Sequence, residues 1–186
     1  LHSAARVWWL LSLFGALSVA LLDGGLEAWR AAGRPVTVGP AGAPEAPGLF
    51  LAQADLARVR SLREVRTHVE AGDAQIVDAR SPGRFAGAEP EPRPGVEPGH
   101  IPGAINLPYS RLFEADGRWK SPDAIAAEFA AAGVDPAKPM VATCGSGITA
   151  CVLAFGAERI GGLMPVYDGS WTEWGSDPST PKAKDA

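Results

Sequence analysis

The sequence contains little cysteine. Cys144 and Cys151 are the only two among 186 residues, too few for the disulfide framework that stabilises small secreted domains. Their spacing matches neither a CxxC redox motif nor a pair of zinc ligands. We therefore expect free thiols in a reducing, cytoplasmic setting. We expect no metal, because His2 and His68 have no ligand partners at metal-binding spacing, and the sequence predicts no cofactor.

The chain also lacks runs of basic residues and long apolar segments. Its formal net charge is −4, and without a cluster of Lys and Arg no nucleic-acid partner is expected. The uncharged apolar segment 7–22 has 16 residues and is followed by Asp23, whereas a membrane-spanning helix needs roughly 20. We predict a buried helix here, a turn at Phe14-Gly15 and a buried strand at 19–22, with no membrane association.

Glycine and proline, in contrast, are abundant and mark a boundary. Residues 39–48 consist almost entirely of Gly, Pro and Ala, a composition typical of a linker. On either side of it, LDGGLEAW (residues 22–29) is similar to YDGSWTEW (residues 167–174), and both segments follow an apolar run. Such self-similarity predicts two copies of one domain.

The two predicted copies differ in length. Residues 49–186 predict a complete domain, while residues 1–38 predict only the last helix, strand and helix of a first domain. The chain also begins with Leu1 rather than Met. We therefore expect a fragment of a two-domain protein, or a chain whose missing first-domain part is supplied by another chain or segment.

Strand and helix signals alternate through residues 49–186. Ser61 and Glu64 predict a capping box at one helix start, and Ser121-Pro122 predicts another start. This alternation is typical of a parallel α/β sheet with helices on both faces. The predicted strands are 75–79, 104–107, 140–143 and 164–167, and the predicted helices are 61–72, 121–133 and 149–160, with an irregular loop over 80–103.

The segment TCGSGITA (residues 143–150) places Cys144 between a predicted strand and a predicted helix. Backbone N–H groups are unpaired at the start of a helix, and Gly145 and Gly147 allow the loop to turn several of them toward one point. Ser146 and Thr149 add hydroxyl donors. A thiolate is stabilised in such a setting, so the loop predicts a nucleophilic sulfur beside an anion-binding hollow.

Two other interpretations of this loop compete with a nucleophile. A free cysteine is often buried and inert, which is what we expect for Cys151. A cysteine-dependent phosphatase needs an arginine six residues after its cysteine, but Ala150 occupies that position. No basic residue occurs between Cys144 and Arg159, so a singly charged substrate fits better than a doubly charged phosphate.

GHIPGAINLP (residues 99–108), CGSGIT (144–149) and YDGSWTEW (167–174) occur in this order along the chain. Together they resemble the rhodanese superfamily. The Gly-Ser-Gly after the cysteine resembles its 3-mercaptopyruvate sulfurtransferase branch, because two basic residues typically follow the cysteine in thiosulfate-preferring members. The resemblance implies a rhodanese-like parallel sheet flanked by helices on both faces.

The resemblance also implies a reaction. The Cys144 thiolate takes the sulfur of 3-mercaptopyruvate and pyruvate leaves, so that a persulfide remains on the enzyme. A thiol such as thioredoxin, or cyanide in an assay, then accepts the outer sulfur. Ser146 matches the family's hydroxyl relay, which polarises the thiol or the substrate. Other implied substrate-binding residues are Arg84 and Arg93, which grip the carboxylate, and the loop residues Gly145, Gly147, Ile148 and Thr149.

Alternatives to this assignment stay open. Arg84 and Arg93 could instead be solvated loop arginines that pair with Glu89, Glu91 or Glu97. The domain could use thiosulfate in place of mercaptopyruvate. The chain could also be a non-catalytic module that binds a partner or carries sulfur, because the resemblance places the partners of the hydroxyl relay in the absent first domain.

Overall fold

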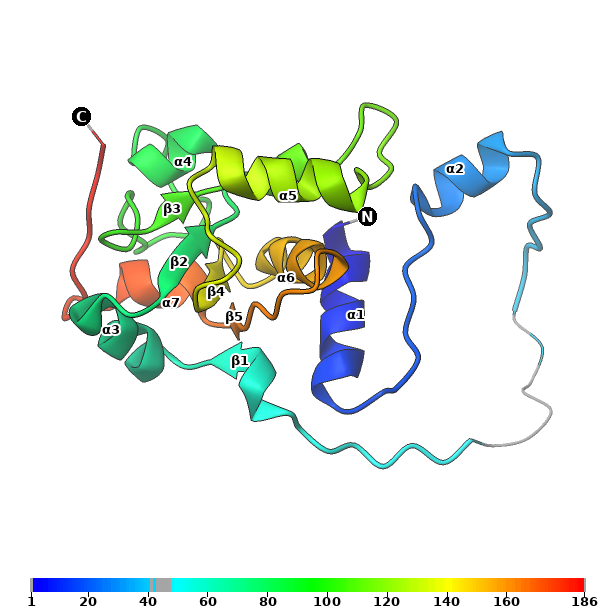
Figure 1. The fold of residues 1–186 in the computed structure, drawn as a ribbon, viewed down its shortest axis with the longest axis horizontal. Coiled ribbons are helices and arrows are strands. Elements are labelled where there is room, and N and C mark those ends of the chain that lie inside the picture. The colour runs from blue at the N-terminus through cyan, green and yellow to red at the C-terminus, as the bar shows by residue number, and fades with distance from the viewer. Residues whose placement is uncertain (1, 41, 43–47, 186) are drawn as a thin grey trace.

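The structure, a computed structural model, describes residues 2–40, 42 and 48–185 (Figure 1). Positions 41 and 43–47 of the predicted linker lie outside the described residues. The helices are α1 (His2–Leu13), α2 (Gly25–Ala31), α3 (Leu62–Ala71), α4 (Pro82–Ala86), α5 (Pro122–Ala131), α6 (Ala150–Arg159) and α7 (Ser170–Ser176). The strands are β1 (Val59–Arg60), β2 (Gln75–Asp78), β3 (Ile105–Asn106), β4 (Met140–Thr143) and β5 (Val166–Tyr167), with 3-10 turns η1 (Leu56–Arg58) and η2 (Tyr109–Leu112).

The five strands form one sheet in the order β1-β5-β4-β2-β3. β4 lies at its centre: it pairs with β2 along its whole length, up to Asp78 opposite Thr143, and with β5 on its other side. Every pairing is parallel, so the carboxyl ends of the strands meet at one edge, where α/β proteins place their ligands. The predicted parallel α/β sheet is confirmed.

Alternate residues of the central strands enter two separate cores, as the two-residue period of a strand requires. Val77 and Ala142 pack into a core shared with α1, α5 and α6. Ile76 and Val141 pack into a second core with residues of α3 and with both tryptophans of α7. Helices therefore cover both faces of the sheet, as predicted. Helix α7 packs beside the carboxyl edge of the sheet.

Helix α1 packs into the same unit as the sheet, although the repeat assigns it to a first domain. Trp8 lies edge-on against Phe155 of α6 with the ring centroids 4.8 Å apart, and Trp9 is only 2% exposed. Removing one buried Trp side chain costs about 3–5 kcal/mol, so α1 is a structural part of the domain. The division into residues 1–38 and 49–186 stays a prediction.

The predicted buried strand at 19–22 is wrong. These residues form no strand, and Leu22 is 51% exposed. A strand needs a neighbour to satisfy its backbone groups, and no strand among the described residues pairs with this segment. Beyond it, α2 stands apart from the sheet (Figure 1) and buries none of its residues.

Local signals explain where helices α3 and α5 begin. Ser61 and Glu64 form the predicted capping box at the start of α3, and Ser121 Oγ accepts the N–H of Ala124 at the start of α5. Sequence analysis missed α4, which interrupts the loop predicted for 80–103. That helix has only 5 residues and begins at Pro82, so it is too short to show a hydrophobic period.

None of the helices within the described ranges is both long and apolar enough to cross a membrane. Helix α1 has 12 residues, which at 1.5 Å per residue span about 18 Å of a hydrocarbon layer roughly 30 Å thick.

Candidate active site

The centre of the sheet delivers Cys144 to the carboxyl edge. Cys144 follows β4 directly, and its residue surface is 1% exposed. Cys144 and the next five residues form the loop that leads into α6, hereafter the cysteine loop (residues 144–149). A pocket of about 310 Å³ opens beside this loop. Its lining residues are Arg84, Glu91, Pro92, Arg93, Cys144, Gly145, Ser146, Ile148, Thr149 and Thr172.

The carbonyl groups of the cysteine loop are held from outside. The N–H of Trp171 donates to Cys144 O at 2.9 Å, and Thr172 donates to Gly145 O through its N–H at 2.9 Å and through Oγ1 at 2.6 Å. In a trans peptide the C=O and the following N–H point in opposite directions. The N–H groups of Gly145 and Ser146 therefore point away from α7.

The amide groups of this loop are free to bind a ligand. Within the described part of the chain, no backbone or side-chain acceptor takes the N–H of any residue from Gly145 to Thr149. Unpaired N–H groups that converge on one hollow bind anions or developing negative charge. The loop thus offers unpaired donors beside Cys144, and their convergence on one point stays a prediction.

Arg84 of α4 lies directly on this loop. A Cβ atom at Gly145 would come within 2.8 Å of Arg84 Nη2, so only glycine allows the guanidinium to approach so closely. Arg84 is positioned by Glu91, whose carboxylate bonds its Nε at 3.2 Å and its Nη2 at 2.5 Å. The pairing with Glu91 was the alternative expected from the sequence, and it occurs within the pocket rather than in solvent.

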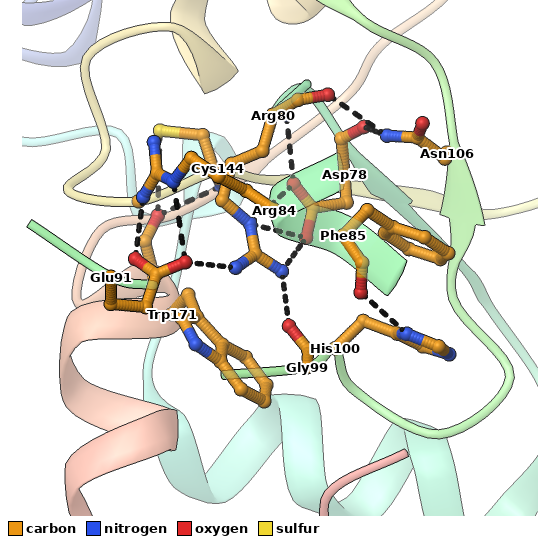
Figure 2. Close-up of polar contacts among 12 residues, drawn as sticks. Asp78, Arg80, Arg84, Phe85, Glu91, Gly99, His100, Asn106, Cys144 and Trp171 are labelled. Atoms are coloured by element: carbon orange, nitrogen blue, oxygen red, sulfur yellow. Dashed lines mark hydrogen bonds and ion pairs between the residues drawn. The ribbon is translucent and has the colours of Figure 1, made fainter. Parts of the chain in front are cut away.

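Glu91 joins Arg84 to a buried ion network below the pocket (Figure 2). It also accepts from Arg80 Nη1 at 2.9 Å, while Arg80 grips Asp78 through Nε and Nη2. The Arg80 guanidinium lies 4.8 Å from the centre of the Trp171 ring. These two carboxylates balance these two arginines, so the network is formally neutral. A buried network with every charge paired fixes geometry, because removing any member leaves a buried charge uncompensated.

Arg93 lies at the mouth of the pocket, and its charge is not balanced in this way. It is exposed and makes no ion pair within the described ranges. The charged Arg, Lys, Asp and Glu side chains that line the pocket are Arg84, Arg93 and Glu91. Their formal charges sum to +1. Among the lining residues, Arg84 is already paired with Glu91, so Arg93 is the cation left to pair with one carboxylate.

Seven of the eight residues expected in the site line this one pocket. Ser146 and Thr149 are partly buried and present hydroxyl groups, and Ile148 supplies an apolar wall that is 43% exposed. Gly147 is the exception. It is buried behind the loop with φ of 76°, a left-handed conformation that favours glycine.

Ser170, the first residue of α7, contacts Cys144. Sequence analysis did not single it out. Its Oγ accepts the N–H of Cys144 at 3.2 Å and donates to Tyr167 O at 2.9 Å. The same oxygen lies 3.9 Å from Cys144 Sγ. Ser170 is fully buried and has φ of 51°, an uncommon conformation for a residue with a side chain. Strain of this kind persists where the surroundings enforce it and is concentrated at functional sites.

Comparison with known proteins agrees with this architecture. The family model for the rhodanese-like domain matches residues 61–177. The chain belongs to the rhodanese family. This match covers the strands β2 to β5, the cysteine loop and α7, and so contains the whole pocket described above.

Rhodanese relatives of two kinds are similar to the chain. The 3-mercaptopyruvate sulfurtransferase of Homo sapiens is 47% identical over 175 residues, which is 94% of this chain and 58% of the relative. The thiosulfate sulfurtransferase of Bos taurus is 40% identical over 173 residues, or 92% and 58% of the two chains. The chain therefore spans somewhat more than half the length of these curated relatives.

A solved rhodanese structure gives the same result for the fold. SseA of Escherichia coli, described as having the rhodanese fold of 3-mercaptopyruvate sulfotransferases, superimposes with a TM-score of 0.79 at 36% identity. The superposition covers 91% of this chain and 63% of that one. The fold implied by the sequence resemblance is confirmed.

The second cysteine of the rhodanese domain has a different environment. Cys151 is fully buried in the first core, and burial raises the pKa of its thiol from 9.0 to about 12. Its Sγ donates to Gly147 O at 3.1 Å. It therefore stays a protonated thiol at neutral pH and braces the loop from behind.

His100 also serves the rhodanese domain through local contacts. Its Nδ1 lies 2.9 Å from Phe85 O, and its ring stacks on Phe85 with the centroids 4.0 Å apart (Figure 2). These contacts fix α4, and so the position of Arg84. As for metals, the part of the chain that the structure describes contains no group of three or more His, Cys, Asp or Glu placed to hold an ion.

Proposed function

We propose that this rhodanese chain carries the reactive half of a sulfurtransferase that moves sulfur from 3-mercaptopyruvate to a thiol through a persulfide on Cys144. The observation that carries the proposal is the union of a strand-end cysteine, a ring of unpaired amides and one excess positive charge in a single pocket. The names of the similar sulfurtransferases support the same reaction class.

The charge of the pocket supports the choice of donor. Mercaptopyruvate carries one carboxylate, and its charge matches the single excess positive charge of Arg84, Arg93 and Glu91. Thiosulfate is a dianion, and Gly145-Ser146-Gly147 offers it no cation. Arg84 is already fixed by Glu91, so a bidentate contact with its free edge costs little side-chain entropy.

The reaction balances in two steps. The Cys144 thiolate forms an S–S bond with the donor sulfur while the donor C–S bond breaks, and the electron pair leaves on pyruvate enolate. The enolate takes the proton that the donor sulfur carried and becomes pyruvate. The persulfide anion on Cys144 remains beside the unpaired N–H groups of the loop. An acceptor thiolate then attacks the outer sulfur, and Cys144 departs as a thiolate stabilised by the same N–H groups.

Ser146 lies where its hydroxyl can polarise the donor. It lines the pocket two residues from Cys144, and within the described ranges its side chain makes no hydrogen bond. We assign it the relay role, with its own partners in a first domain of which residues 1–38 are the end. Thioredoxin-like thiols are the proposed acceptors, and a reducing, cytoplasmic setting stays a prediction.

Intact mass spectrometry tests the proposal. After incubation with 3-mercaptopyruvate, the chain should gain 32 Da on Cys144, and Cys144→Ser should gain nothing. A wild-type chain that acquires no sulfur from any donor would identify a non-catalytic module. Sulfur acquired faster from thiosulfate than from mercaptopyruvate would show that the donor assignment is wrong.

Arg93→Ala tests carboxylate recognition separately. It removes the excess charge of the pocket, so KM for mercaptopyruvate should rise about tenfold, which corresponds to one charge-assisted contact. The rate at which neutral iodoacetamide alkylates Cys144 should stay within twofold. Lys138→Ala, which removes another exposed cation far from the pocket, is the matched control. An equal effect of Arg93→Ala on both reactions would argue against a carboxylate contact.

A further inference from the structure

Arg6 of α1 reaches the back of the cysteine loop from the other end of the chain. Its Nη1 donates to Gly147 O at 3.3 Å and to Asp168 Oδ1 at 2.5 Å. Its guanidinium also lies over the Trp9 ring, 4.6 Å from the centre. These three contacts distinguish Arg6 from a surface ion pair, in which one long side chain is held by one partner.

The contact with Gly147 determines the direction of one loop amide. Gly147 O accepts from both Arg6 and the Cys151 thiol, so the carbonyl is held toward α1 and the core. Across the trans peptide, the N–H of Ile148 must then point to the opposite side. Ile148 lines the pocket, and its N–H has no acceptor within the described part of the chain.

The space around Gly147 has no room for a side chain. A Cβ atom there would lie 2.8 Å from both Asp168 O and Asp168 Oδ1, and 3.1 Å from Arg6 Nη1. With φ of 76° the residue is also left-handed. Glycine, the arginine and the aspartate therefore fill one site behind the loop, and a residue with a Cβ atom at position 147 would displace Arg6 or Asp168.

Three carbonyl groups of the cysteine loop accept hydrogen bonds from residues outside the loop. Helix α7 holds Cys144 O and Gly145 O through Trp171 and Thr172. Arg6 holds Gly147 O, and Asp168, two residues before α7, holds Arg6. The cysteine loop is thus clamped between α1 and the turn that starts α7.

We propose that Arg6, oriented by Asp168, is a positioning residue that turns the Ile148 N–H into the amide ring around Cys144. It touches neither the sulfur nor the substrate and acts through the Gly147 peptide. This deepens the proposed function, because a persulfide anion on Cys144 would be held by the amide that Arg6 orients. It also gives residues 2–13 a role in the chemistry as well as in packing.

The test compares Arg6→Ala with Arg58→Ala in the full chain. The two arginines match in exposure, with side chains 23% and 25% exposed, and Arg58 pairs with Asp55 and Glu158 away from the loop. The rate at which iodoacetamide alkylates Cys144 is measured as a function of pH, with peptide mapping to separate Cys144 from Cys151.

We expect Arg6→Ala to slow alkylation of Cys144 at neutral pH about tenfold, to displace the rate profile to higher pH, and to lower kcat with mercaptopyruvate more than it raises KM. Arg58→Ala should leave the profile within twofold of wild type. Arg6→Lys, which keeps a donor, should fall between wild type and Arg6→Ala.

Overlapping profiles for Arg6→Ala and Arg58→Ala would overturn the proposal and leave Arg6 a packing role only. Where Arg6→Ala does not fold, judged by circular dichroism, Arg6→Lys and Asp168→Asn are compared with Arg58→Ala in the same way. Alkylation requires no sulfur donor. A wild-type chain that alkylates rapidly but never gains 32 Da would therefore refute the proposed function while leaving the positioning role intact.

Discussion

The two similar segments of the chain, residues 22–29 and 167–174, each lead into a helix of 7 residues, but they lie in opposite surroundings. Gly25 and Ser170 occupy the same place in the motif and are both left-handed, with φ of 66° and 51°. The indole of Trp29 donates to Pro35 O at 2.9 Å, and that of Trp174 donates to Pro181 O at 2.7 Å. Yet α2 buries no residue, whereas α7 buries four.

Both copies of the motif form a short helix, but they differ in whether their residues contact the cysteine loop. The Asp-Gly turn and the distant Trp suffice to form the short helix, since both copies have it. Only the second copy lies under a cysteine loop, where its N–H groups and Ser170 find carbonyl and amide partners. The motif therefore contacts the cysteine loop only in the copy whose place in the sheet brings it there.

The largest difference between the copies should be in stability. Trp174→Ala removes a fully buried ring and should lower the free energy of unfolding by about 3–5 kcal/mol. Trp29→Ala should change it by less than about 1 kcal/mol. Urea denaturation followed by circular dichroism measures both, and equal losses would show that α2 is as firmly packed as α7.

The next difference concerns chemistry. Ser170→Ala leaves the buried N–H of Cys144 without its acceptor, a defect of about 1–3 kcal/mol, so persulfide formation on Cys144 should slow at least about tenfold. Ser176→Ala, in the same helix but exposed, is the matched control and should be silent. A Ser170→Ala chain with the wild-type rate would remove Ser170 from the site.

Exchanging the left-handed residues separates strain from function. Gly25→Ala places a side chain at φ of 66° and should destabilise the fold by about 1–2 kcal/mol. Ser170→Gly relieves comparable strain but loses two hydrogen bonds, so stability should change little while sulfur transfer falls. Thermal melts run beside the persulfide assay check this; loss of stability and activity together in Ser170→Gly would contradict it.

A further difference between the copies appears in alkaline solution. Burial raises the pKa of Tyr167 above its ordinary 10.0 and that of Cys151 from 9.0 to about 12. Above these ordinary values the unfolded chain loses protons that the folded chain keeps, so the free energy of unfolding should fall as pH rises from about 9 to 12. Tyr167→Phe and Cys151→Ala should each flatten this slope in urea titrations at several pH values. Leu22, at the position of Tyr167 in the first copy, contributes nothing to it.

Much of the fold could be predicted from the sequence because its signals are local. The bounds of β4, the capping box at Ser61 and the proline start of α5 depend on neighbouring residues only. The strand predicted at 19–22 failed because its apolar pattern says nothing of whether a partner strand is present. The five-residue α4 was too short to produce a pattern.

The residues of the candidate site also fall into two groups, those with a local sequence signal and those without one. Cys144 and Gly145 could be predicted to line the candidate site because a strand-loop-helix pattern surrounds them. Ser170, Glu91 and Arg6 were not singled out as site residues, since each acts through a contact that only the folded chain creates. The one available signal was Ser170, the non-glycine residue at a place where the first copy of the motif has Gly25.

The bond between Arg6 and Asp168 joins residues 162 positions apart. On a ribosome, helix α1 must wait until residue 168 has emerged before the carbonyl of Gly147 can be anchored through this ion pair. Contacts of such long sequence separation form late and slowly. If Arg6 has the positioning role proposed above, the thiol of a nascent chain becomes reactive only after the strands of the sheet have been synthesised.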